Sequence, residues 1–124
     1  LTPEGLKNLC VRWHKEYGSA LPDLYITENG AAYDEGISED GKCHDPRRTA
    51  YLQTHIKAIA DAIAEGAPVK GYYEWSLMDN FEWALGYAKR FGIVHVDFDT
   101  QKRTIKDSGY FYADVIKQNG KNIS

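Results

Sequence analysis

The sequence has 124 residues, and its 15 basic and 18 acidic side chains give a formal net charge of −3. This length allows one domain, and a hydrophobic share of 43% argues against a disordered chain. The charges form no basic or acidic block, and no apolar run approaches the roughly 20 residues of a membrane span. We therefore expect neither a nucleic-acid partner nor a membrane partner.

The chain opens at Leu1, without an initiator methionine and directly on a helix signal, so we expect a piece of a longer polypeptide. The two cysteines, Cys10 and Cys43, are too few for a disulfide framework and lack the spacing of a zinc site. We predict two free thiols. Free thiols favour a reducing compartment, so a cytoplasmic location is the expectation.

The first half of the chain predicts helix, strand and helix. Thr2 followed by proline predicts a helix that continues to Tyr17 and ends at Gly18. Residues 24–27 are short, apolar and β-prone, as in a buried strand, and residues 31–43 read as a polar loop. Asp45 with the following proline predicts a second helix, which Gly66 and Pro68 end.

The second half predicts a strand over residues 69–76, a loop, and a hairpin of residues 91–98 with 103–106. Asp107 or Ser108 is expected to cap a last helix, which Gly120 closes. Helices alternating with strands indicate a parallel α/β architecture, but two strands cannot close a barrel or form a stable open sheet. We predict one incomplete α/β unit over residues 1–124.

A carboxylate follows the first predicted strand. In parallel α/β folds the active site lies at the carboxyl ends of the strands, and Glu28 stands there, ahead of Asn29-Gly30. From this placement Glu28 is a candidate catalytic residue. A solvated acid beside an ordinary Asn-Gly turn is the alternative.

A cluster of indoles and carboxylates follows the second predicted strand. Trp75, Glu82 and Trp83 lie within nine positions, with Asp79 nearby. Sugars present hydroxyl groups, which carboxylates accept, and apolar faces, which stack on aromatic rings, so this cluster suits a carbohydrate pocket. An aromatic core patch with a helix-capping acid is the alternative.

Other kinds of site lack their motifs. There is no glycine-rich phosphate loop, and the four histidines are scattered without metal-ligand spacing, so we expect no metal and no cofactor. We interpret His44 as a helix-end partner of Asp45, and Lys89-Arg90 as a solvated pair rather than an anion site.

Three segments together resemble the C-terminal part of glycoside hydrolase family 1, the family of β-glucosidases: residues 24–30 (LYITENG), 71–83 (GYYEWSLMDNFEW) and 89–93 (KRFGI). The resemblance extends over nearly the whole chain. It implies a (β/α)8 barrel several hundred residues long, of which this chain would supply helix six, strands seven and eight, and the following helices.

The resemblance also implies roles for five residues. Glu28 matches the catalytic nucleophile, and Trp75 matches the tryptophan that stacks under the sugar in the −1 subsite. Glu82 matches the carboxylate that grips two sugar hydroxyls, Trp83 its hydrogen-bonding neighbour, and Phe91 an aromatic residue lining the same pocket. Phospho-glycosidases of the family tend to carry serine at the position of Glu82, so an unphosphorylated β-glucoside or β-galactoside is the expected substrate.

The resemblance leaves the machinery incomplete, because the family's acid/base glutamate lies in an Asn-Glu-Pro segment and this chain has none. The isolated chain is therefore expected to be inactive. Glu74 departs from the family, which usually has a small or apolar residue there. We predict that Glu74 pairs with a cation or lies on a frayed, exposed strand.

Three functional hypotheses follow. The chain is part of a retaining β-glycosidase, or a module that binds sugar and associates with itself or with the N-terminal remainder of the barrel, or an inactive remnant. Unpaired strand edges and the expected inward-facing side chains favour association. Those side chains are Leu24, Ile26, Tyr73 and Trp75.

Overall fold

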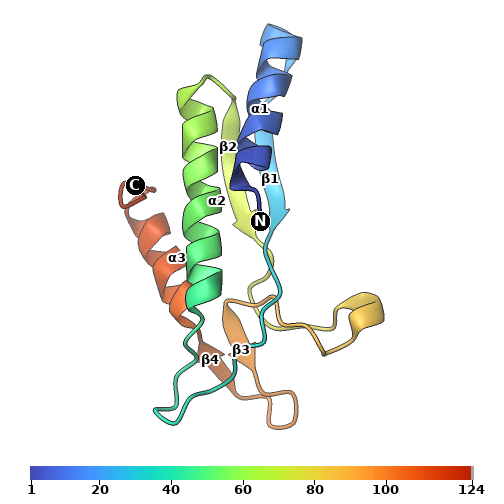
Figure 1. Ribbon diagram of the computed structural model, residues 1–124, viewed down its shortest axis with the longest axis vertical. Coiled ribbons are helices and arrows are strands. Elements are labelled where there is room, and N and C mark those ends of the chain that lie inside the picture. Colours follow the sequence, from blue (N-terminus) through green and yellow to red (C-terminus); the bar gives the residue numbers. More distant parts are fainter. Residues whose placement is uncertain (124) are drawn as a thin grey trace.

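The structure, a computed structural model, describes residues 1–123. Its helices and strands are, in chain order, α1 (Pro3–Tyr17), β1 (Leu24–Asn29), α2 (Pro46–Ala64), β2 (Val69–Glu74), β3 (Val94–Val96), β4 (Arg103–Ile105) and α3 (Asp107–Lys117), as Figure 1 shows. Two 3-10 turns, η1 (Gly18–Ala20) and η2 (Trp83–Leu85), complete the list. None of the helices described is long and apolar enough to span a bilayer.

Strands β1 and β2 form a parallel pair, as predicted. Leu24 lies opposite Val69 and Asn29 opposite Glu74, so the two strands end at the same edge of the sheet. Strand β2 ends two residues earlier than predicted. The cause is a change of partner: the Ser76 N–H donates to the Phe91 carbonyl (3.2 Å) instead of to β1.

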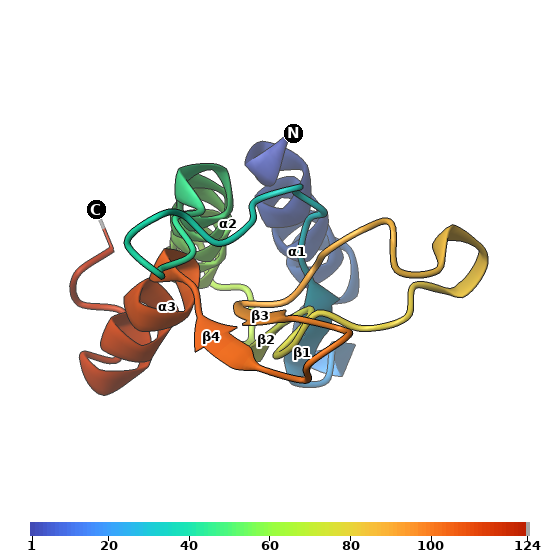
Figure 2. The ribbon, with the colours of Figure 1, turned by 90° about the horizontal axis from the view of Figure 1, so that it is seen from below.

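Helices α1 and α2 cover one face of this sheet and leave the other open (Figure 2). Leu24 and Ile26 pack against the helix-side core, which corrects the prediction that they face the interior of a barrel. Side chains alternate along a strand, so Tyr25 and Tyr73 face the open side, where they are 55% and 58% exposed. The helix-side core consists of Cys10, Val11, Ile59, Ala62, Ala67 and Val69.

The predicted helix starts are confirmed, although the residue before each start does not cap its helix. Thr2 and Asp45 occupy the positions before Pro3 and Pro46, and neither side chain makes a capping hydrogen bond. Asp45 is fully buried and instead accepts hydrogen bonds from the Ser108 backbone N–H (2.8 Å) and hydroxyl (2.5 Å). Asp45 therefore joins the start of α2 to the start of α3.

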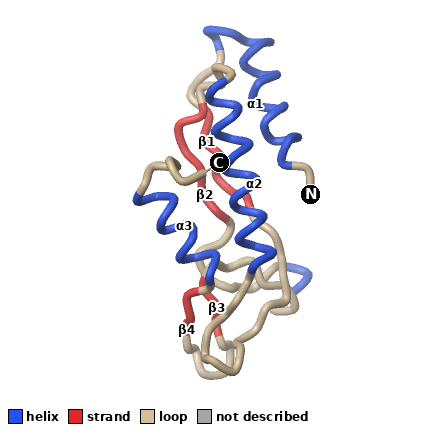
Figure 3. Tube along the Cα trace, turned by 60° about the vertical axis from the view of Figure 1, so that its left-hand side comes forward, coloured by secondary structure: helices blue, strands red, loops and turns tan. Residues whose placement is uncertain are grey.

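The hairpin forms as an antiparallel pair, β3 with β4, and is shorter than predicted. It lies beyond the carboxyl ends of β1 and β2 and leads directly into α3, which runs beside α2 (Figure 3). Lys106 precedes the first residue of α3. The expected caps, Asp107 and Ser108, lie inside the helix, and Ser108 contacts Asp45.

Candidate functional site

The structure places Glu28 and Trp75 at the ends of neighbouring strands. Glu28 is the last residue but one of β1 and is exposed, and Trp75 directly follows β2. The Trp75 N–H donates to the Asn29 carbonyl (3.0 Å), and the Tyr72 hydroxyl holds the Asn29 side chain (2.9 Å). The two candidate residues therefore stand on ordered backbone at one edge of the sheet.

Glu82 contacts Trp75 through its side chain. The Trp75 indole Nε1–H donates to Glu82 Oε1 at 3.2 Å, although the two residues are separated by seven positions. The structure thus brings the indole and the carboxylate together. Phe91 is half-buried, and its carbonyl accepts the Ser76 N–H.

Trp83 is a predicted site residue that takes no part in these contacts. It begins η2, has a positive φ of 45°, and is 85% exposed. Figure 2 shows the segment around η2 standing away from the sheet and helices. Trp75, which is 36% exposed, therefore contacts Glu82 through its indole. The neighbouring Trp83 faces solvent.

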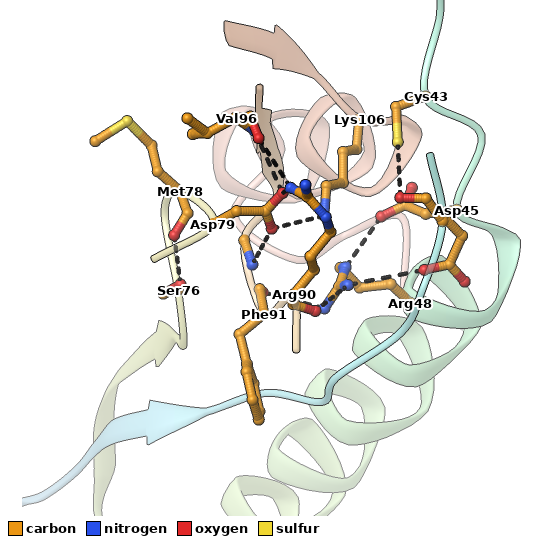
Figure 4. Close-up of polar contacts among 12 residues, drawn as sticks. Cys43, Asp45, Arg48, Ser76, Met78, Asp79, Arg90, Phe91, Val96 and Lys106 are labelled. Atoms are coloured by element: carbon orange, nitrogen blue, oxygen red, sulfur yellow. Dashed lines mark hydrogen bonds and ion pairs between the residues drawn. The ribbon is translucent and has the colours of Figure 1, made fainter. Parts of the chain in front are cut away.

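Arg48 is an organising residue that the sequence analysis missed. Its side chain is fully buried at the start of α2 and donates to the carbonyls of Ala31, Phe91 (3.1 Å) and Arg90 (2.9 Å). It also contacts Asp45 (3.1 Å), as Figure 4 shows. The guanidinium therefore joins the segment after β1 to the segment that carries Phe91. The sequence offered one signal. Arg48 lies four residues before Leu52, on the same face of the helix, where an apolar residue is expected.

Asp79 has a structural role. It is buried, pairs with Lys106 (3.0 Å) and Arg90 (2.6 Å), and accepts the backbone N–H groups of Gly92 and Val96. Burial acts to raise the pKa of Asp79, but the two cations and the hydrogen bonds outweigh it and keep the pKa below its ordinary value. Arg90 is thus an ion-pair partner, which corrects its interpretation as part of a solvated pair.

The prediction for Glu74 is wrong. Both carboxyl oxygens are buried, and neither has a hydrogen-bond partner. Burial raises the pKa of Glu74 to about 8, against a lowering effect of the Arg48 charge. The carboxyl is therefore mainly protonated at neutral pH, which avoids the large cost of an unpaired buried charge.

The remaining candidates are structural. His44 contacts Asp107 (2.7 Å) and Asp40 (3.0 Å) rather than Asp45, which corrects the predicted pair. Cys10 and Cys43 are both buried and free, as predicted. Among residues 1–123, no group of three or more His, Cys, Asp or Glu side chains is arranged to hold a metal ion.

Comparison with known proteins gives consistent matches. The family model described as glycosyl hydrolase family 1 matches residues 1–121. The chain is similar to β-glucosidase A of Thermotoga maritima, at 56% identity over 97% of this chain and 26% of that protein. It is also similar to a 6-phospho-β-galactosidase of Staphylococcus aureus, at 47% identity over 91% of this chain and 24% of that protein.

Solved structures match in the same way. The Thermotoga maritima β-glucosidase in complex with glucoimidazole superimposes with a TM-score of 0.91 and 57% identity, over 95% of this chain and 26% of that one. The chain thus spans about a quarter of the length of these relatives, which are TIM-barrel enzymes, and its two parallel strands form part of such a barrel. Since the family model covers 121 of the 124 residues, the chain belongs to glycosyl hydrolase family 1.

Proposed function

We propose that this chain is the part of a retaining β-glycosidase that carries the nucleophile, Glu28, on strand seven of the barrel and the sugar-stacking Trp75 after strand eight. The observation that carries the proposal is the register of β1 and β2, which puts Glu28 and Trp75 at one edge of the sheet. Family membership supports the hydrolysis of β-linked glycosides.

In this mechanism Glu28 is ionised and attacks the anomeric carbon of the sugar, forming a covalent glycosyl-enzyme. A second carboxyl group, about 5–5.5 Å from the first, protonates the leaving oxygen and then activates the water that releases the sugar. Trp75 supplies a stacking face, and Glu82 accepts hydroxyl hydrogen bonds. Trp83 and Phe91 complete the part of the −1 subsite that this chain provides.

The acid/base carboxyl must come from outside the chain. Glu82 already accepts the Trp75 indole N–H, and the resemblance gives it the role of binding sugar hydroxyls, so we assign it no part in protonating the leaving group. Retaining hydrolysis needs both carboxyl groups, and removal of one such group lowers the rate by several orders of magnitude. The 124-residue chain alone is therefore proposed to be inactive.

Complementation tests the proposal. The chain is mixed with the preceding three-quarters of Thermotoga maritima β-glucosidase A, and hydrolysis of an aryl β-glucoside is followed. Activity should appear on mixing and fall by at least about 10³-fold with Glu28→Gln. Glu39→Gln, a change of an exposed loop glutamate, is the matched control. Full activity of the Glu28→Gln mixture would show that the nucleophile lies elsewhere.

A second candidate function is association without catalysis. A groove of about 370 Å³ runs between α2, β2 and α3, and its lining includes Ile63, Val69 and Ile116. With the open sheet face, this groove supports pairing with the N-terminal remainder of a barrel or with a second copy.

The substrate is proposed to be an unphosphorylated glycoside, because the carboxylate of Glu82 beside the sugar would repel a phosphate group. Glucosides and galactosides both fit this description. The buried free thiols of Cys10 and Cys43 support the proposal of a reducing, cytoplasmic environment.

A further inference from the structure

The carboxyl group of Glu74 is buried beside the turn that follows Glu28. Glu74 is the last residue of β2, opposite Asn29 and adjacent to Trp75. A Cβ atom added to Gly30 would overlap the Trp75 carbonyl oxygen and lie 3.3 Å from Glu74 Oε1. The carboxyl group therefore packs against the turn that follows Glu28, where strand seven would meet strand eight.

The cations near this carboxyl group are already engaged. Arg48 exerts the strongest favourable charge effect on Glu74, but its N–H groups donate to Asp45 and to three backbone carbonyls. Lys106 pairs with Asp79 at 3.0 Å. Other ionisable groups act on Glu74 from three elements. Asp45, Arg48 and Tyr51 lie on α2 or just before it, and Tyr72 lies on β2. Lys106 and Tyr112 lie just before α3 and on it.

We propose that Glu74 is a positioning residue: in its protonated form it packs, buried and without a cation, against the close contact between Gly30 and Trp75, and loss of the proton loosens that contact. The part of this inference that concerns sugar binding rests on the proposed function. The part that concerns structure does not.

The physical basis is the cost of an unpaired charge in this position. A neutral carboxyl group packs there without a cation, whereas a carboxylate must gain a cation or water. Burial raises the pKa of Glu74 to about 8, so this change falls at mildly alkaline pH.

The structural test is an NMR titration of the chain from pH 5 to pH 10. The chain is labelled with 13C at glutamate side-chain carboxyls and with 15N throughout. The Glu74 carboxyl carbon, the Gly30 amide and the Trp75 indole N–H should move together with a midpoint near pH 8. Glu74→Gln should abolish the movement at Gly30 and Trp75, and Glu39→Gln should leave it in place.

Two results would overturn the proposal. One is a Glu74 carboxyl that titrates while the Gly30 and Trp75 signals stay still, and the other is a Glu74 midpoint below about pH 6, near the ordinary glutamate value. Both are read from the unsubstituted chain, so they stand even if Glu74→Gln fails to fold.

The binding test uses the complemented barrel and isofagomine lactam, a ligand found with the Thermotoga maritima relative. With a pKa near 8, most molecules carry the Glu74 proton at pH 7 and about a tenth carry it at pH 9. If only the protonated form binds the ligand, the Kd should rise about tenfold between these two pH values. For Glu74→Gln the rise should stay below about twofold. A tenfold rise in that variant too would overturn the proposal. If the Glu74, Gly30 and Trp75 signals titrate together but the complemented barrel hydrolyses no glycoside, only the proposed function would be overturned.

Discussion

At the scale of single residues, Glu82 is the residue that we propose selects among sugars. Its carboxylate is held by the Trp75 indole, so its charge has a definite position beside the proposed sugar pocket. A negative charge there repels a phosphate group and accepts hydroxyl groups. The relative from Staphylococcus aureus is a 6-phospho-β-galactosidase, which makes this discrimination a property to test by substitution.

Glu82→Ser in the complemented barrel should shift preference toward phosphorylated sugars. Loss of a like charge about 4 Å from a phosphate removes about 1–4 kcal/mol of repulsion, equivalent to about 5- to 1,000-fold. The measurement is the ratio of kcat/KM for a 6-phospho-β-galactoside to that for the unphosphorylated galactoside. Glu39→Ser is the control, and an unchanged ratio in Glu82→Ser would contradict a role for Glu82 in sugar selection.

At the scale of elements, the site depends on contacts that bind loops to helices. Arg48 joins the segment after β1 to the segment before β3, and Asp45 joins α2 to α3. His44 makes a third link, from the 31–43 loop to α3, through Asp40 and Asp107. These links hold irregular backbone that the sheet itself does not order.

Arg48→Lys should destabilise the chain by about 2–4 kcal/mol. Lysine keeps the charge but lacks the planar fork that reaches several carbonyls at once, so buried acceptors lose their partners. Urea unfolding at pH 7, with all variants at the same chain concentration, measures the change. Arg47→Lys is the matched control, because the Arg47 side chain is 62% exposed and its replacement should cost less than about 0.5 kcal/mol. Equal effects of the two changes would refute a special role for Arg48.

The His44 link should weaken as the pH rises. Hydrogen bonds to Asp107 and then Asp40 raise the pKa of His44 above 6.5. A raised histidine pKa gives a stabilisation that is fully present below pH 6.5 and is lost as the pH rises through the folded-state value. The urea midpoint of the unsubstituted chain should therefore fall, between pH 5.5 and 8.5, by more than that of His44→Gln.

The difference between these two curves isolates His44, because the other titrating groups are common to both proteins. Asp107→Asn should remove most of the same difference, since Asp107 is the larger contributor to the shift. Parallel curves for the unsubstituted chain and His44→Gln would show that the link contributes nothing.

At the scale of the whole molecule, the described chain leaves surfaces that a complete barrel would cover. One face of the β1–β2 sheet carries exposed aromatic side chains, among them Tyr25, Tyr73 and Trp75. The groove between α2 and α3 lies along β2 and is largely apolar in lining. Unpaired strand edges beside apolar surface favour association with another chain.

The isolated chain should therefore associate, and light scattering at micromolar concentration measures its mass. We expect a mass above the 14.1 kDa of the monomer. Addition of the complementary barrel segment should replace this species by a one-to-one complex, because both occupants compete for the same surfaces. A monomer that stays monomeric at high concentration and ignores the complement would contradict the expected association.

Local signals in the sequence determined the elements and their order. Pro3 and Pro46 mark the two long helix starts, and the apolar runs around Ile26 and Tyr72 mark the parallel strands. The positions of Glu28 and Trp75 at strand ends follow from that order. Such signals act over about four residues, so pattern alone suffices to read them.

Tertiary structure alone decided which face each strand buries and which polar groups meet. Leu24 and Ile26 turn toward the helices, and Asp45 meets Ser108 across 63 positions. Arg48 and Glu74 are polar residues in places where the periodic pattern predicts apolar ones. Their roles depend on charges and carbonyls from distant segments, and no local preference encodes the distance between groups so far apart in the chain.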